Sequence, residues 1–231
     1  MLKNALIVIW LLSAVFCFGQ SNFTRGEELL MQNKPSEAVG FLERAIAEDP
    51  VHVQAFLYLG IVYEQLNRTD QAITVYRRIL PSAGSLSANV ANNLGNVYFQ
   101  RGNTEEAERY YTDAIGFNGA YARAYLGRAN TRIKAGSLMN AVQDYEQYLL
   151  LEPSSAQRYN IERLIALIRQ EVATEEMRRL MAEEEARRIA EERQKLLDSV
   201  SASLQSAADS SQGLSTGAEG VEGYEGEFVL E

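Results

Sequence analysis

The stretch ANNLGNVYFQRGNTEEAERYYTDA, residues 91–114, contains the pattern that decides the fold. In it the small residue Gly95 is followed twelve positions later by Ala107, and four positions after that by the bulky Tyr111. The pattern occurs four times, and its small residue recurs at intervals of 34, 35 and 34. The matching residues are Gly26, Gly60, Gly95 and Ala129, then Ala38, Ala72, Ala107 and Ala141, then Leu42, Tyr76, Tyr111 and Tyr145. A period near 34 predicts stacked helix–turn–helix repeats.

Each predicted repeat consists of two antiparallel helices, and neither helix can bury its apolar stripe alone. Glycine inside a helix costs about 1 kcal/mol relative to alanine. Its recurrence in phase therefore indicates that the partner helix approaches closely at that point. We expect an all-α solenoid of about four repeats over residues 21–155, with boundaries at about 21–52, 53–87, 88–121 and 122–155.

Further positions agree in phase with this pattern, namely Tyr63, Tyr98, Pro50 and Pro153. Together these residues resemble the tetratricopeptide repeat family over roughly residues 20–155. The fourth repeat departs from the family pattern, because Arg128 and Arg132 stand where apolar residues are usual. The resemblance implies a surface that binds a protein or peptide partner, with the first helix of each repeat lining a concave groove.

Asparagines are concentrated on the first helix of the third repeat, where helix propensity gives no reason for them. A carboxamide offers two donors and an acceptor, which suits it to bind an extended peptide backbone. The asparagines could equally bond neighbouring helices or water. The candidate groove residues are Gln54, Leu57, Ile61, Asn89, Asn92, Asn93, Asn96, Arg123 and Asn130.

One groove known in the family clamps the carboxylate end of a chaperone tail with lysine, asparagine and arginine side chains. In this sequence Asn93 and Arg123 match that clamp. Three further positions do not match, and they hold Leu57, Ile61 and Gly127. We therefore expect a different ligand, namely an extended segment of another protein of the cell envelope.

The N-terminal residues 1–20 have the features of a secretory signal. Lys3 is followed by an apolar run from Ala5 to Phe18, which is shorter than the roughly 20 residues of a membrane span. We expect an exported bacterial-type protein located in the periplasm. Membrane association is expected only if the segment stays uncleaved, or if Cys17 carries a lipid, which would anchor the protein facing the periplasm.

Beyond the repeats, the composition predicts three further segments. Helical apolar spacing over residues 156–172 predicts a helix that caps the last repeat. Residues 173–199 are charged on nearly all sides, which fits both a coiled-coil dimer and a solvated single helix. Residues 200–231 contain no Lys or Arg and many Ser, Ala and Gly residues, so we expect a disordered acidic tail.

Catalytic and metal-binding motifs are not evident in the sequence. His52 is the only histidine and Cys17 the only cysteine, and no phosphate-binding glycine loop or metal-ligand spacing occurs. The formal net charge is −9 and the basic residues alternate with acids, which argues against nucleic acid as a partner. We expect no enzyme activity, no metal and no cofactor.

These observations predict a non-catalytic interaction scaffold or adaptor of the cell envelope that binds a peptide segment in its concave groove. The first alternative is a structural assembly component that oligomerises or docks through the charged C-terminal helix. A more remote alternative is an envelope enzyme. The sequence leaves the partner and the oligomeric state open.

Overall fold

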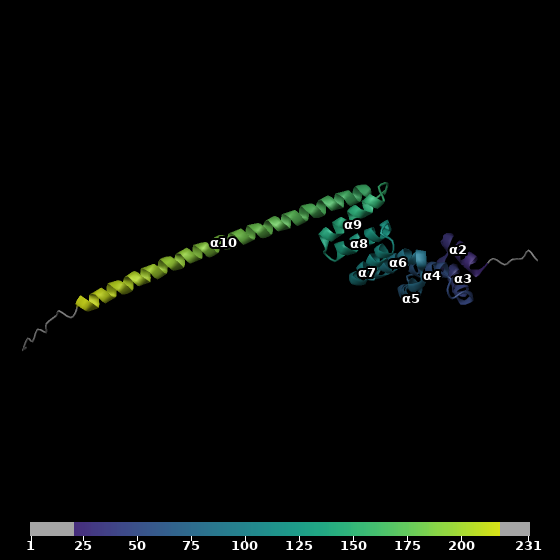
Figure 1. The fold of residues 1–231 in the computed structure, drawn as a ribbon, viewed down its shortest axis with the longest axis horizontal. Helices are drawn as coiled ribbons and strands as arrows, with labels where there is room; N and C mark the ends of the chain where they lie inside the picture. The colour runs from purple at the N-terminus through teal and green to yellow at the C-terminus, as the bar shows by residue number, and fades with distance from the viewer. Residues whose placement is uncertain (1–20, 218–231) are drawn as a thin grey trace, which may run out of the picture. The chain divides into compact units, whose positions relative to one another are not determined.

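The computed structural model describes residues 21–217, and every regular element in this range is helical (Figure 1). The chain divides into two parts, the first ending at Arg169 and the second beginning at Gln170. The first part confirms the expected all-α solenoid. Its helices are α2 (Asn22–Met31), α3 (Pro35–Glu48), α4 (Val53–Gln65), α5 (Thr69–Ile79), α6 (Ser87–Gln100), α7 (Thr104–Phe117), α8 (Ala122–Lys134) and α9 (Leu138–Leu151).

The helices pack as four consecutive pairs, each of which forms one repeat. The paired helices are α2 with α3, α4 with α5, α6 with α7, and α8 with α9. The second helix of each repeat also contacts the first helix of the next, and one hydrophobic core runs from α2 to the start of α8. Figure 1 shows the labelled pairs following one another in chain order within the first part.

Close helix–helix contact explains the small residues of the sequence pattern. A methyl group added at Gly95 would lie 2.7 Å from the ring of Tyr111, and one at Gly26 would lie 2.7 Å from the side chain of Leu42. The four alanines of the pattern, Ala38, Ala72, Ala107 and Ala141, are completely buried. In the first three repeats the glycine of the pattern thus lies where the two helices approach too closely for a larger side chain.

The turn between the two helices has the same backbone conformation in every repeat. A residue with positive φ follows the first helix, and these residues are Asn33, Asn67, Gly102 and Gly136. In the third repeat the N–H of Gly102 donates to the carbonyl of Phe99, and that of Asn103 to the carbonyl of Tyr98. The other three repeats show the same two bonds, which make up the Schellman motif that ends a helix. Asparagine and glycine are the residues that adopt this conformation most readily.

The single inserted residue that lengthens one period to 35 lies in the connection between the second and third repeats. Two short 3₁₀ turns, η2 (Leu80–Ser82) and η3 (Gly84–Leu86), fill this connection. Gly84 begins the second of these turns and has a φ of +56°. The extra residue is therefore absorbed in a loop, and the contacts of α6 with α5 and α7 are kept.

The last helix differs from the expectation of two helices and a tail. α10 (Arg158–Gly217) is continuous, so residues 200–217 are helical where disorder was expected. Neither proline nor glycine occurs between Arg158 and Gln212, and nothing in the local sequence ends the helix there. The predicted signal (1–20) and the end of the predicted tail (218–231) lie outside the described residues.

The two stretches of α10 have different surroundings. In the first part Ile161, Ile165 and Ile168 are buried, as a helix that covers the last repeat requires. From residue 173 to residue 210 every side chain is exposed, and arginines pair with glutamates three or four positions away. Such exposed ion pairs add only a little to the stability of a solvated helix.

No helix within residues 21–217 is long and apolar enough to span a bilayer.

Candidate functional site

The first helices of successive repeats contact one another and form one continuous face, which we call the inner face. Contacts join α2 to α4, α4 to α6, and α6 to α8. All nine predicted groove residues lie on α4, α6 and α8. The helix pairs thus bring the candidates together on adjacent helices, although the candidates differ in how much surface they expose.

On α4, the three candidates have three different environments. Leu57 is 7% exposed and belongs to the hydrophobic core, so it offers little surface to a ligand. Ile61 is half-buried against the same core, and Gln54 is exposed. Only Gln54 and Ile61 are therefore available on this helix.

Asn92 of α6 is buried, with an exposure of 5%. Its Nδ2 donates to Oδ1 of Asn93 at 3.5 Å, whereas its own Oδ1 is buried without a hydrogen-bond partner. The same position of the second and fourth repeats holds Leu57 and Leu126. An unpaired buried carbonyl is unfavourable by about 1–3 kcal/mol, so Asn92 lowers the stability of the third repeat.

Asn93 connects the third repeat to a polar pair in the second. Its Nδ2 donates to the hydroxyl of Tyr76 at 3.3 Å, and that hydroxyl donates to Glu64. Burial raises the pKa of both Glu64 and Tyr76. Glu64 was not among the sequence candidates, because nothing in the repeat pattern distinguishes it from the solvated glutamates.

Two asparagines of the inner face are held in place by tyrosines from the second helices. The hydroxyl of Tyr111 donates to Oδ1 of Asn96 at 2.8 Å, and that of Tyr145 donates to Oδ1 of Asn130 at 2.7 Å. Burial raises the pKa of both tyrosines further above neutral pH, where a tyrosine hydroxyl is already protonated and can donate. The two pairs share a separation of 15 residues, a signal that the sequence contains and the sequence analysis missed.

The remaining candidates are Asn89 and Arg123. Asn89 is half-buried on α6, and its side chain forms no hydrogen bond within residues 21–217. Arg123 is exposed at the start of α8 and lies near Tyr121. Burial raises the pKa of Tyr121, and the arginine opposes this shift. Arg123 is therefore the cation that the candidate set offers to a ligand.

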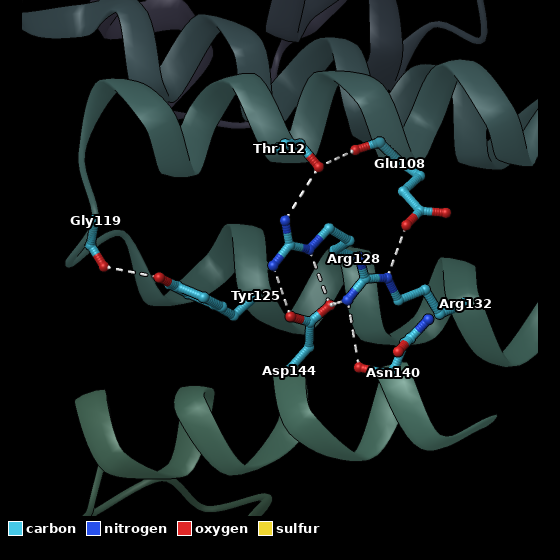
Figure 2. A network of polar contacts seen from close by, with 8 residues as sticks. All are labelled: Glu108, Thr112, Gly119, Tyr125, Arg128, Arg132, Asn140 and Asp144. Carbon is cyan, nitrogen blue, oxygen red and sulfur yellow. Dashed lines mark hydrogen bonds and ion pairs between the residues drawn. The ribbon is translucent and has the colours of Figure 1, made fainter. Parts of the chain in front are cut away.

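A network of charges surrounds the buried Asp144 in the fourth repeat (Figure 2). Asp144, 3% exposed, accepts hydrogen bonds from Nε and Nη2 of Arg128 at 2.9 and 2.7 Å, and from Nη1 of Arg132 at 2.8 Å. Nε of Arg132 also donates to Glu108 of α7 at 2.7 Å, and Nη1 of Arg128 donates to Thr112 at 3.1 Å. The two arginines that depart from the repeat pattern thus join α7, α8 and α9, and their charges are satisfied within the fold.

His52, the only histidine in the sequence, has a structural role in the fold. Nδ1 of His52 accepts the backbone N–H of Ala55 at 3.2 Å, so the side chain caps the start of α4. Within residues 21–217 no three His, Cys, Asp or Glu side chains are grouped so that they could hold a metal ion.

Two models of the tetratricopeptide repeat match the chain, one over residues 23–87 and the other over residues 87–117. Human protein O-mannosyl-transferase TMTC3 is 26% identical over 146 residues, which cover 57% of this chain and 16% of TMTC3. The mouse protein matches to the same extent. The shared region is therefore a small fraction of these relatives.

Solved structures share the fold at low sequence identity. MamA is 21% identical with a TM-score of 0.57, over 64% of this chain and 84% of MamA. PilF of Pseudomonas aeruginosa is 20% identical with a TM-score of 0.58, over 66% of this chain and 68% of PilF. YrrB, described as a TPR protein with an unusual peptide-binding site, is 18% identical with a TM-score of 0.53, over 64% of this chain and 76% of YrrB.

Arrays of this kind generally act as non-catalytic scaffolds, because stacking creates an extended binding surface. The helix pairs of the structure and the two repeat matches agree in position. Residues 23–117 therefore match the tetratricopeptide repeat in both sequence and helix pairing, and α8 and α9 continue the same solenoid.

Proposed function

We propose that this solenoid is a protein-interaction scaffold that binds an extended segment of a partner along the inner face of α4, α6 and α8. The observation that carries the proposal is the pair of oriented carboxamides, Asn96 and Asn130. Each oxygen accepts a tyrosine hydroxyl, and neither Nδ2 forms a hydrogen bond within residues 21–217. Each Nδ2 is thus free to donate to a ligand.

The spacing of the two amides suits a peptide backbone. Asn96 and Asn130 occupy the same position of adjacent first helices, which contact each other. Packed helices lie about 8–10 Å apart, and an extended chain advances about 3.3–3.6 Å per residue. The two amides would therefore meet carbonyls about three residues apart. Bonds to the backbone tolerate many side chains, as a scaffold requires.

The test replaces the two amides together, as Asn96→Ile with Asn130→Ile. The second repeat already has Ile61 at this position, so isoleucine is compatible with the fold. The partner is first isolated with the full-length protein from the native cell extract and is then titrated calorimetrically. Each lost hydrogen bond should weaken binding by about 0.5–1.5 kcal/mol.

The matched control is Asn140→Ala. Asn140 is exposed on α9, and only its backbone carbonyl forms a hydrogen bond, with Arg132. This variant should bind like the wild type. If the double isoleucine variant also binds like the wild type while its melting curve shows that it is folded, the partner docks elsewhere and the proposal fails.

Arg123 adds an electrostatic test of the same face. If a partner carboxylate meets it, Arg123→Ala should weaken binding by about 1.5–3 kcal/mol at low salt. This loss should shrink as salt screens the charges, whereas the loss from the two amides should not. A salt-independent effect of Arg123→Ala would exclude a carboxylate contact.

We further propose that the scaffold acts in the cell envelope of a bacterial cell after export. The motivation is the sequence of residues 1–20, with Lys3 before an apolar run. The intact mass of the protein from its native cell should lack about the first 20 residues, within the usual signal length. The mature protein should also show no tryptophan emission, because Trp10 is the only tryptophan. Full-length protein in the cytosol would contradict export.

A further inference from the structure

A hollow of about 340 Å³ lies between α8, α9 and the first turns of α10, all within the first part of the chain. Its apolar lining comes from Leu126 of α8 and from Ile161 and Leu164 of α10. Leu126 and Leu164 are half-buried, so apolar surface remains open to solvent there. The volume is near the lower end of the range of about 300–1,000 Å³ for ligand pockets.

Three carboxamides, Asn130, Gln157 and Asn160, also line the hollow. The side chains of Gln157 and Asn160 are exposed and form no hydrogen bond within the described residues. Asn130 accepts the hydroxyl of Tyr145 and keeps its Nδ2 unbonded. Apolar surface thus lies beside several unused donors and acceptors, the combination that binds a peptide residue by both its side chain and its backbone.

The lack of charged side chains in the lining decides which kind of partner residue the hollow accepts. No Asp, Glu, Lys, Arg or His side chain lines the hollow, and the tyrosine hydroxyl that lines it is bonded to Asn130. A charged side chain placed there would lose its hydration without gaining a counter-charge, which is strongly unfavourable. An uncharged apolar side chain would lose only unfavourable contact with water.

We propose that this hollow is an anchor pocket for one large aliphatic or aromatic side chain of the partner segment. The carboxamides of Asn130, Gln157 and Asn160 bond the backbone on either side of that residue. The inference rests on the proposed function and adds a sequence requirement to it. The inner face would accept many sequences, whereas the anchor pocket would select for an apolar residue at one position.

The experiment uses a phage-displayed library of random dodecapeptides selected against the full-length protein. Selected peptides should share one Leu, Ile, Met or Phe, and its replacement by Glu should weaken binding about tenfold or more. Asn160→Trp fills the pocket from an exposed position and should weaken the same peptides to a similar degree. The matched control is Arg163→Trp, an equally exposed position of α10 outside the pocket lining, which should leave binding unchanged.

Several outcomes would overturn the anchor pocket. One is selected peptides without a shared apolar residue, and another is binding that survives Asn160→Trp. Selection of peptides with an acidic end whose binding depends on Arg123 would show a carboxylate clamp instead. Displacement of the selected peptides by a synthetic peptide of residues 218–231 would identify the occupant as this chain's own C-terminal segment, and would contradict a partner anchor.

The same peptides separate this inference from the proposed function. If Asn96→Ile weakens binding but Asn160→Trp does not, the inner face binds peptide and the anchor pocket is wrong. Asn96 lies outside the lining of the hollow, so it reports on the inner face alone. If only Asn160→Trp weakens binding, the pocket binds an isolated residue and the extended path along α6 is wrong.

Discussion

The third and fourth repeats have the same backbone plan but very different cores. Three positions that are apolar or aromatic in the third repeat are ionic in the fourth, with each pair 34 residues apart. The corresponding residues are Leu94 and Arg128, Tyr98 and Arg132, and Tyr110 and Asp144. In the third repeat the two tyrosine rings stack with centroids 5.4 Å apart. In the fourth repeat both arginines donate hydrogen bonds to the aspartate carboxylate.

This difference teaches that the repeat geometry does not depend on one kind of core. The helix pairs are held in register by the small-residue contacts and by the left-handed turns, which all four repeats share in some form. What fills the remaining core space can then change. The energetic consequences should nevertheless differ, because a buried charge without its partner is far less favourable than a smaller apolar side chain.

The largest effect is expected at the centre of the ionic core. Asp144→Ala removes the buried carboxylate that the half-buried Arg128 and Arg132 share, which should lower the free energy of unfolding by up to about 3–5 kcal/mol. Urea unfolding of the variant measures this loss. Asp113→Ala, which removes a half-exposed pair with Arg109, should cost less than about 1 kcal/mol. Equal losses would mean that Asp144 is not a buried partner.

A somewhat smaller effect is expected from overpacking the third repeat. Gly95→Leu forces a branched side chain against the Tyr111 ring and should destabilise the protein by about 1–3 kcal/mol. Gly116→Ala is the control, since a methyl group there meets no atom within 4 Å. It should stabilise α7 by up to about 1 kcal/mol. A tolerated Gly95→Leu in thermal unfolding would show that the helices are not in close contact.

Exchanging the two cores tests the comparison directly. The triple variant Arg128→Leu, Arg132→Tyr and Asp144→Tyr gives the fourth repeat the residues of the third. Replacing buried ionic partners together by packed apolar residues is often neutral or stabilising, by about 1–4 kcal/mol. Glu108 loses its partner Arg132 in this variant, but its side chain is 36% exposed and can be hydrated. We expect the free energy of unfolding, measured in urea, to stay the same or to rise by no more than about 2 kcal/mol. A loss comparable to that of Asp144→Ala would show that the ionic core is required by its surroundings.

At the position of Asn92 the third repeat is the polar one, because the second and fourth repeats have leucine there. Asn92→Leu installs the residue type found at this position in the second and fourth repeats and removes an unpaired buried carbonyl. The free energy of unfolding should rise by about 1 kcal/mol, the lower end of the cost of such a group. A drop in the melting temperature would mean that the carbonyl has a partner in solution, such as a buried water.

The smallest effect concerns Glu64. Burial raises its pKa in the folded protein, so the folded state holds this proton more tightly than the unfolded state does. Its contribution to stability is therefore greatest below its ordinary pKa, and falls as pH rises through the folded pKa. Glu64→Gln should remove this slope and make the protein slightly more stable near neutral pH. Parallel pH–stability curves for variant and wild type would contradict this assignment.

The candidate site could be predicted only in part. The sequence placed the groove residues on α4, α6 and α8, because a repeat with a known period assigns each residue to a helix face. It could not show that Asn92 is buried, or that Asn96 and Asn130 accept tyrosine hydroxyls. These facts depend on contacts between helices that are distant along the chain. The anchor pocket was missed for the same reason, since α10 meets α8 only in the folded protein.

The sequence by itself determined the repeat architecture. Small residues at fixed intervals and turn residues in phase are local signals, and the same signals recur in every repeat. It misjudged the end of α10, because low hydrophobicity predicts a lack of packing but not a lack of helix. Only the tertiary structure decided how Arg128 and Arg132 are accommodated, since Asp144 and Glu108 reach them from two other helices. Periodicity assigns a side chain to a face, whereas the partner of a buried polar group is set by three-dimensional packing.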